Sequence, residues 1–246
     1  MPRRGINLGR CKNKYLIIDI FFFSAEQDAR KEAEAVLWLC SRGHKKFLAR
    51  NFDWYPRNLE WKSLSLSLME QSGQVESMKQ PKFLFDNIRI NGKTEVKKVT
   101  RIFTASIDGW EASAFHLYCD GRGPTLCLIR SSDEYLSAGF ASIAWTSDGT
   151  SVEDASACVF ALTDTLQVFK TKNPEKALYH HSWQGPIWYD ALGLDGHMQR
   201  GWSFTKGDEM DNGKYEIVRL PDGKNPLTGS TGDFYTCTEI EVFALE

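Results

Sequence analysis

The sequence predicts a protein of the α+β class that is mainly β: a two-layer antiparallel β-sandwich with peripheral helices, preceded by a helical N-terminal extension. Many short apolar segments separated by turn residues predict short strands, whereas segments with a helical period are few. Hydrophobic residues make up 42% of the chain and aromatic residues 13%, which is ample for a packed core. The sequence contains no internal repeat and no low-complexity tract.

The chain begins with a basic tail. Residues 1–14 carry several Lys and Arg side chains and no acid, and a short apolar run follows at 15–23. This outline is typical of a targeting segment, but Asp19 interrupts the apolar run. The run is also too short for a transmembrane segment, which needs about 20 apolar residues. We expect a leading strand or docking segment, and targeting to an organelle stays an alternative.

A long amphipathic helix is expected at residues 24–41. Ser24 and Gln27 fit a capping box, and Gly43 stands where a C-terminal cap is expected. Apolar side chains form one stripe along this helix, and charged side chains occupy the opposite side. The stripe predicts either a core contact or a partner-binding face.

The segment from 42 to 80 is too aromatic for a solvated linker, so we expect it to pack on the main domain or on another protein. Its candidate docking residues are Phe52, Trp54, Tyr55 and Trp61. The polar residues 72–80 form the best linker, which places a boundary near Gln80. The predicted organisation is an N-terminal extension at 1–80 and a main domain at 81–246.

The stretch from 101 to 145 is the central unit of the main domain. Its expected elements are a strand at 101–106, a turn at Asp108-Gly109, a helix at 111–118, and strands at 125–130 and 135–143. In the helix, Ala112, Phe115 and Cys119 lie on one face at positions i, i+3 and i+7.

Further short strands are expected towards the C-terminus. They lie at 158–162, at 214–220 and at 236–245. In the last strand Ile240, Val242 and Ala244 share one face, and the other face carries Glu239, Glu241 and Phe243.

Several of these segments together resemble the TLDc domain family. The motifs are SIDGWEASAFH, CDGRGPTLCLI and SAGFASIAW in the central unit, then SACVFAL, LYHHSWQGP and the terminal TEIEVFAL, in the order of the family. The resemblance covers roughly residues 80–246. It implies a TLDc-like β-sandwich, and the family-motif positions are Asp108, Gly109, Glu111, Gly139, Trp145, Glu239 and Glu241.

Relatives in this family are implicated in protection against oxidative stress and in binding and regulating the vacuolar-type ATPase. The resemblance therefore implies a non-enzymatic protein-interaction domain whose favoured partner is that proton pump. Some relatives carry a serine, suspected of chemistry, two residues after the glycine of the DG turn. Glu111 occupies this position here, so activity dependent on that hydroxyl is not expected.

Charge and cysteine content limit the partners and the compartment. The 30 basic and 32 acidic residues are interspersed and give a net charge of −2, so a nucleic-acid partner is not expected. The six cysteines are scattered without a C-x-x-C pair, which favours a reducing compartment. We expect an intracellular protein, in the cytoplasm unless the basic tail directs it elsewhere.

No pattern in the sequence predicts catalysis, a metal or a cofactor. His180 and His181 are adjacent in an expected strand, so their side chains point to opposite faces and do not share a metal. Pro124 follows Gly121-Arg122-Gly123 and has no N–H for a phosphate, and no G-x-S-x-G elbow occurs. Cys119 stands beside Asp120 at a helix C-terminus, which disfavours a reactive thiolate.

Two alternatives to the interaction domain stay open. The first alternative is a structural accessory subunit that docks into a large complex through its N-terminal extension. The second alternative is an uncharacterised hydrolytic or redox enzyme. The second alternative would use Glu241 with His116 or a cysteine.

Overall fold

The computed structural model describes residues 68, 71–72, 81–90 and 96–246. The chain divides into two compact units, Met1–Leu66 and Ser67–Glu246, and the described residues belong to the second. The basic tail, the helix expected at 24–41 and the docking residues Phe52, Trp54, Tyr55 and Trp61 lie outside the described residues. The linker expected at 72–80 is described only at Ser72, so the boundary near Gln80 stays a prediction.

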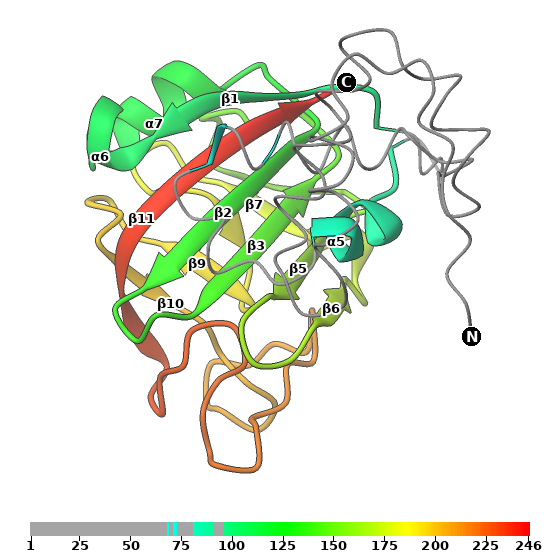
Figure 1. Ribbon diagram of the computed structural model, residues 1–246, viewed down its shortest axis with the longest axis vertical. Helices are drawn as coiled ribbons and strands as arrows, with labels where there is room; N and C mark the ends of the chain where they lie inside the picture. Colours follow the sequence, from blue (N-terminus) through cyan, green and yellow to red (C-terminus); the bar gives the residue numbers. More distant parts are fainter. Residues whose placement is uncertain (1–67, 69–70, 73–80, 91–95) are drawn as a thin grey trace, which may run out of the picture. The chain divides into compact units, whose positions relative to one another are not determined.

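One layer of the fold is an antiparallel sheet in which neighbouring strands often lie far apart in sequence (Figure 1). Its order is β6 (Gln167–Lys170), β5 (Cys158–Ala161), β3 (Leu136–Ala141), β2 (Thr125–Ser131), β11 (Phe234–Leu245) and β1 (Val99–Thr104). Apolar residues in β2 and β3, together with the β-branched Thr125 and Ile129 of β2, favour this buried, central position in the sheet.

The long strand β11 connects this sheet to the second layer. Its residues 237–244 pair with β2 and its residues 241–245 with β1, whereas residues 234–236 pair with β10 (Arg200–Trp202). From β10 the second layer continues to β9 (Leu192–Leu194) and β8 (Ile187–Trp188). Because β11 pairs with strands of both layers, this one strand determines how the two layers lie relative to each other.

The main core lies between the two layers. Inward side chains of the first sheet, such as Cys127 and Val242, pack with Trp188 and Leu192 of the second. Gly139 in β3 makes room for this packing, because a Cβ there would stand 2.4 Å from the Trp188 indole. The described residues thus form the predicted two-layer antiparallel β-sandwich with peripheral helices.

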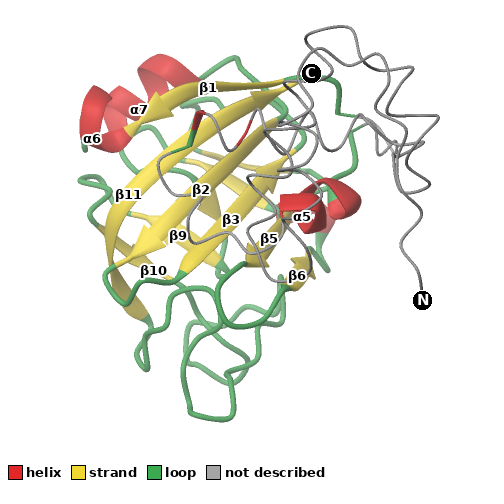
Figure 2. Ribbon diagram, in the orientation of Figure 1, coloured by secondary structure: helices red, strands yellow, loops and turns green. Residues whose placement is uncertain are grey.

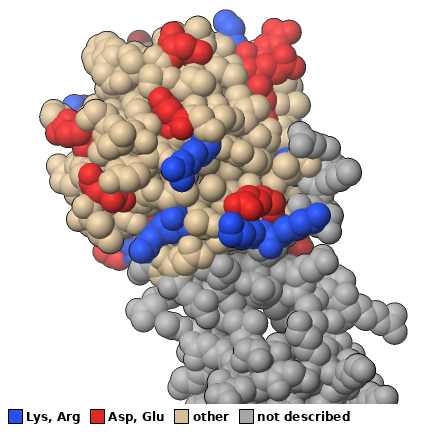
Figure 3. Space-filling view, turned by 90° about the horizontal axis from the view of Figure 1, so that it is seen from above, with Lys and Arg blue, Asp and Glu red and all other residues tan. Residues whose placement is uncertain are grey.

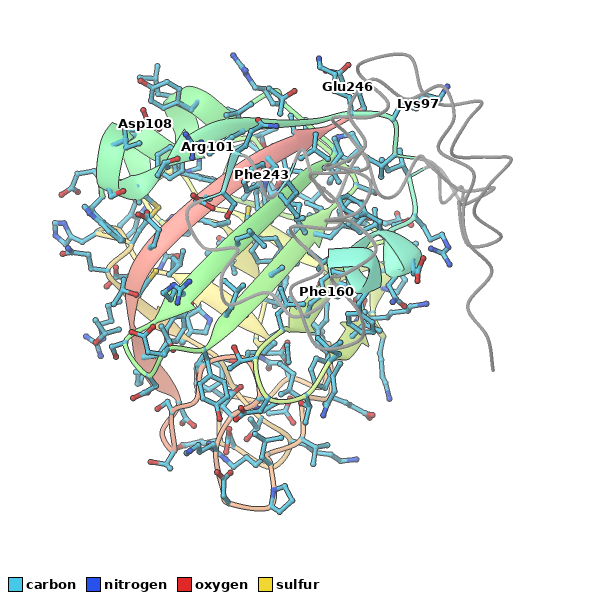
Figure 4. All side chains as sticks on the ribbon, viewed as in Figure 1. Lys97, Arg101, Asp108, Phe160, Phe243 and Glu246 are labelled. Atoms are coloured by element: carbon cyan, nitrogen blue, oxygen red, sulfur yellow. The ribbon has the colours of Figure 1, made fainter. Side chains whose placement is uncertain are left out.

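The opposite face of the first sheet is apolar too. Leu126, Phe140 and Phe243 are neighbours across β2, β3 and β11, and all three are fully buried. Helix α5 (Pro81–Asn87) lies over this face, where Phe83 packs edge-on against Phe160 of β5 with ring centroids 6.1 Å apart (Figure 4). The sheet is therefore buried on both faces, which explains its nearly continuous apolar strands.

A small two-stranded ribbon adjoins the core. It consists of β4 (Thr150–Val152) and β7 (Leu178–His180), with a short 3₁₀ helix, η2 (Pro174–Lys176), just before β7. His180 is buried against Trp145, whereas His181 is half-buried. The two histidines therefore point to opposite sides, as predicted from the strand period.

Two helices stand at the end of β1 (Figure 2). Helix α7 (Ala112–Cys119) confirms the helix expected at 111–118 and buries the predicted face of Ala112, Phe115 and Cys119. Helix α6 (Ala105–Asp108) was not predicted, since the strand expected at 101–106 ends at Thr104. Among the described residues, no helix combines the length and the apolar character needed to cross a membrane.

The prediction of a strand at 214–220 is wrong. Tyr215 and Ile217 are buried as alternation predicts, but Glu216 between them has a φ of 46°, which no strand tolerates. The backbone there bonds to separate segments, from Lys172 N to Lys214 O and from Lys206 N to Ile217 O. Tyr215 and Ile217 are buried where the backbone runs beside two different segments, and this produces the alternation in burial without a strand.

Candidate functional site

The candidate site is the corner formed by α6, α7 and their connection, residues 105–119, which we call the helical corner. The chain turns there at Gly109, whose φ of 120° is readily adopted by glycine only. The Gly109 N–H closes α6 by donating to Ala105 O at 3.0 Å. Asp108 fixes the other end of α6, because its Oδ2 accepts a 2.8 Å bond from the Thr104 N–H.

Glu239 attaches the helical corner to β11. Its Oε1 accepts a 3.2 Å hydrogen bond from the Ser106 N–H and a 2.9 Å bond from the Ile240 N–H. The carboxylate therefore satisfies a free N–H at the start of α6 and another at the irregularity where β11 shifts its register against β2. Glu239 therefore has a structural role: it connects α6 to β11.

Glu241 lies two residues further along β11 and is 2% exposed. Its Oε2 accepts a hydrogen bond from the Ser72 hydroxyl, and its Oε1 lies 3.5 Å from Nη1 of Arg101. Gln71 completes the contact: its Oε1 accepts a 2.7 Å bond from the Arg101 N–H, and its Nε2 donates to Val99 O at 2.9 Å. Glu241 thus holds residues 71–72 against β1 and β11. Arg101 on β1 and Asp108 on α6 are labelled in Figure 4.

Glu111, at the beginning of α7, contacts a histidine. Its Oε1 lies 2.8 Å from Nδ1 of His197, in the loop whose Gly196 O accepts a 2.8 Å bond from the Ala112 N–H. The hydrogen bond and charge of Glu111 raise the pKa of His197 above its usual value. Both side chains are exposed, so the pair contributes little to stability.

Gly139 and Trp145 belong to the core and not to the surface of the corner. Gly139 contacts the Trp188 indole, as described above. Trp145 is 1% exposed, and its Nε1–H donates to Thr125 Oγ1 at 2.9 Å. Trp145 also packs edge-on against Phe115 of α7, with centroids 5.7 Å apart, and so supports the corner from beneath.

The surface of the helical corner is apolar at its most exposed points. Ile107 on α6 is 72% exposed and Leu117 on α7 is 78% exposed, and Tyr118 is exposed beside Leu117. The carboxylates of Asp108 and Glu111 stand at the two helices that carry these side chains. An exposed apolar patch with a polar rim is a feature of surfaces that bind other proteins.

A polar cluster beside α7 was not predicted. His116 Nδ1 lies 2.9 Å from Asp120 Oδ1, and its Nε2 lies 3.0 Å from Gln184 O. The Ser147 hydroxyl donates to the other oxygen of Asp120. In a hydrolase the serine bonds to the histidine, whereas here the carboxylate stands between them. The cluster connects α7 to two loops, and no sequence spacing signals it because 68 residues separate His116 from Gln184.

The described cysteines are all buried: Cys119, Cys127, Cys158 and Cys237. Burial raises the pKa of each thiol well above its usual value, and for Cys119 the neighbouring Asp120 raises it further. The thiolates are therefore disfavoured at neutral pH. Within the described part of the chain, no group of three or more His, Cys, Asp or Glu side chains could hold a metal ion.

These features define a mainly β domain with a short-helix corner on its surface. The sequence matches the family model of the TLDc domain over residues 69–246, so the chain belongs to the TLDc domain family. The match confirms the resemblance drawn from the sequence motifs. A comparison with curated proteins finds no match.

Proposed function

We propose that this chain is a non-enzymatic protein-interaction domain that binds and regulates the vacuolar-type ATPase and thereby takes part in protection against oxidative stress. Membership of the TLDc family supports the interaction role. The observation that carries the proposal is the pair of apolar side chains, Ile107 and Leu117, exposed on two adjoining short helices. The helical corner is the proposed contact with the pump.

The helical corner is suited to docking because hydrogen bonds within the chain already hold its backbone in place. Asp108, Gly109 and Glu239 bond its backbone to β1 and β11, and Trp145 supports α7 from the core. A preformed surface loses little conformational entropy on binding. Exposed aliphatic side chains then provide most of the burial, and the nearby acids favour a partner with basic residues at the rim.

The charge on the rest of this face fits a protein partner. In Figure 3, which looks onto the top of Figure 1, acidic and basic side chains are interspersed and uncharged atoms cover most of the described surface. A face of one sign would favour nucleic acid or a membrane instead. The mixed surface supports recognition by shape and apolar contact.

The test is a binding measurement between the full chain and the purified cytosolic sector of a vacuolar-type ATPase. Replacing both exposed residues (Ile107→Asp with Leu117→Asp) should weaken binding by tenfold or more, a loss of about 1–2 kcal/mol per contact. Met210→Asp with Val218→Asp is the matched control, since both residues are exposed apolar side chains outside the corner. Equal affinity of the corner variant and the control would overturn the proposed contact.

The aromatic residues of the N-terminal extension favour a second candidate, a structural accessory subunit docked through Phe52, Trp54, Tyr55 and Trp61. Replacing these four residues with alanine in the full chain separates the candidates. If partners are then lost from an affinity purification while the corner variant retains them, the accessory-subunit role is supported.

A further inference from the structure

A row of aromatic rings, made of residues outside the helical corner, lies on the outward side of the ribbon β4–β7. Tyr179 and His181 flank the buried His180 in sequence, so both point away from the core. Trp183 follows in a turn, and Tyr189 joins from the segment after β8. The ring centroids are 6.2 Å apart from Tyr189 to Tyr179, 5.4 Å from Tyr179 to His181 and 4.6 Å from His181 to Trp183. We call these four residues the aromatic row.

The aromatic row is accessible and already ordered. Trp183 is 71% exposed, which is unusual for the largest apolar side chain, and the other three rings are half-buried. Each ring is tilted against the next by 56–71°, an arrangement that stabilises aromatic pairs. At one end, the Tyr189 hydroxyl bonds to Ser151 Oγ, and Ser151 stands opposite Tyr179 in the ribbon. A ligand therefore meets a preformed surface.

Two polar atoms of the row indicate what kind of ligand fits. Among the described residues, neither the Trp183 indole N–H nor the Tyr179 hydroxyl has a hydrogen-bond partner. An indole N–H only donates, so the matching ligand combines apolar faces with hydrogen-bond acceptors. A proline-rich peptide has this character, because its rings are apolar, its carbonyls point outward and its prolines lack N–H groups.

The length of the row allows one turn of this ligand. The ring centroids of Tyr179 and Trp183 lie within about 10 Å of each other, since His181 contacts both. A polyproline II helix repeats every three residues with a rise of about 3.1 Å per residue, or about 9 Å per turn. The row is therefore at most about as long as one turn of this helix, and in our proposal the prolines one turn apart lie on Tyr179 and Trp183. Strand addition, the other common peptide mode, would use a sheet edge and not these side chains.

We propose that the aromatic row binds a proline-rich segment of a partner protein in the polyproline II conformation. Tyr179 and Trp183 contact prolines one turn apart, and the indole N–H and the phenol hydroxyl donate to peptide carbonyls. This site does not depend on the proton pump or on the helical corner, because none of its residues belongs to that corner.

The experiment titrates the full chain with decaproline and follows binding by calorimetry. We expect saturable binding that weakens about tenfold or more in Trp183→Ala and in Tyr179→Ala, as for a central aromatic anchor. Phe234→Ala is the matched control, because Phe234 is an exposed aromatic residue in β11 outside the row. It should bind decaproline with unchanged affinity, and circular dichroism checks that every variant is folded.

Three outcomes would overturn the proposal. They are an absence of saturable binding of decaproline, equal affinity in Trp183→Ala and Phe234→Ala, and equal binding of a glycine-serine peptide of the same length. Maltohexaose is titrated in parallel, since exposed aromatic rings also stack on sugars. Binding of maltohexaose that depends on Trp183, without binding of decaproline, would replace the peptide with a carbohydrate. The corner variant (Ile107→Asp with Leu117→Asp) should keep its affinity for decaproline, which separates this site from the proposed pump contact.

Discussion

The carboxylate of Glu241 in β11 lies 3.5 Å from the guanidinium of Arg101 in β1. The Glu241 side chain is buried at 2% exposure, whereas that of Arg101 is about one-third exposed. The same carboxylate accepts a hydrogen bond from Ser72, so it connects β11 both to its neighbouring strand and to a segment that comes earlier in the chain. This geometry gives Glu241 a structural role, because its carboxylate connects three parts of the chain.

We predict that Glu241→Gln lowers the free energy of unfolding by about 1–3 kcal/mol, because the amide keeps the size of the side chain but loses the ion pair and the charged acceptor. Urea denaturation measures this change. Glu246→Gln is the control: Glu246 pairs with Lys98 at 2.9 Å, but both side chains are largely exposed, so the change should stay within about 0.5 kcal/mol. Equal stability of both variants would contradict the structural role of Glu241.

A folded Glu241→Gln variant also tests the enzyme alternative. If the chain acts only through protein contacts, cells that express this variant should retain protection against peroxide in proportion to the amount of folded protein. A complete loss of protection at normal protein abundance would indicate that the carboxylate takes part in chemistry.

Stability should fall in mild acid because of His180. Burial lowers the pKa of His180, although the charges of Asp148 and Asp120 oppose this shift. The unfolded chain, with a histidine pKa of about 6.5, therefore binds more protons than the folded chain. The stabilisation is fully present above about pH 6.5 and is lost as the pH falls through that value towards the lower folded pKa. Urea denaturation at about pH 7.5 and about pH 5.5 measures the difference.

His180→Asn isolates this contribution, since an amide oxygen can accept the bond that the Thr146 N–H donates to His180 Nδ1 at 3.2 Å. The variant should show a smaller loss of stability in acid than the wild-type chain. An acid-induced loss of stability in His180→Asn as large as in the wild-type chain would contradict this assignment. His197 contributes with the opposite sign because its pKa is raised, but its exposure keeps that contribution small.

Gly139→Ala should be strongly destabilising. The added methyl group would stand 2.4 Å from the Trp188 ring, so the indole or the sheet must move in a core that is packed from both layers. Overpacking of this kind costs about 1–3 kcal/mol, measured by thermal or urea denaturation. Gly232→Ala is the control, because the nearest atom to its added Cβ lies 3.7 Å away. A Gly139→Ala variant as stable as Gly232→Ala would mean that the two layers are not in contact at Trp188.

Arg219 should hold the long loops between β10 and β11 together. Its Nη2 lies 3.2 Å from Asp208 Oδ2 and 3.2 Å from Asp233 Oδ1, and its Nη1 donates to Thr231 O at 3.0 Å. Arg219→Lys keeps the charge but cannot reproduce this fork, so we expect a loss of about 1–2 kcal/mol. Limited proteolysis within 205–233 should accelerate in this variant. Lys98→Ala, which removes an exposed ion pair, should leave the proteolysis rate unchanged.

Much of the fold could be predicted because local patterns agree with the tertiary structure. The period of Ala112, Phe115 and Cys119 predicted α7, and the apolar runs of β2, β3 and β5 predicted buried strands. The prediction failed at 214–220, where alternation arose from packing against separate segments. Helix α6 was missed because a single turn of four residues leaves no detectable period.

The candidate site was predicted only in part. The motif positions were found, but the roles of Glu239, Glu241 and Glu111 depend on partners distant in sequence: Ser106, Ser72 and His197. The exposure of Ile107 had no signal, since an apolar residue is normally expected in the core. Leu117 lies off the predicted buried face of α7, so its exposure does follow from the helical period. Side-chain contacts of this kind follow from the packing of the layers and not from local spacing.

The sequence by itself determined the family, the mainly β class and the places of most strands, because periodicity and turn residues act within a few neighbouring positions. Only the tertiary structure decided which carboxylates connect segments distant in sequence, how exposed each apolar side chain is, and which aromatic rings come into contact. These properties depend on β11 joining the two layers. Its pairings with β1 and β2 bring together residues more than a hundred positions apart.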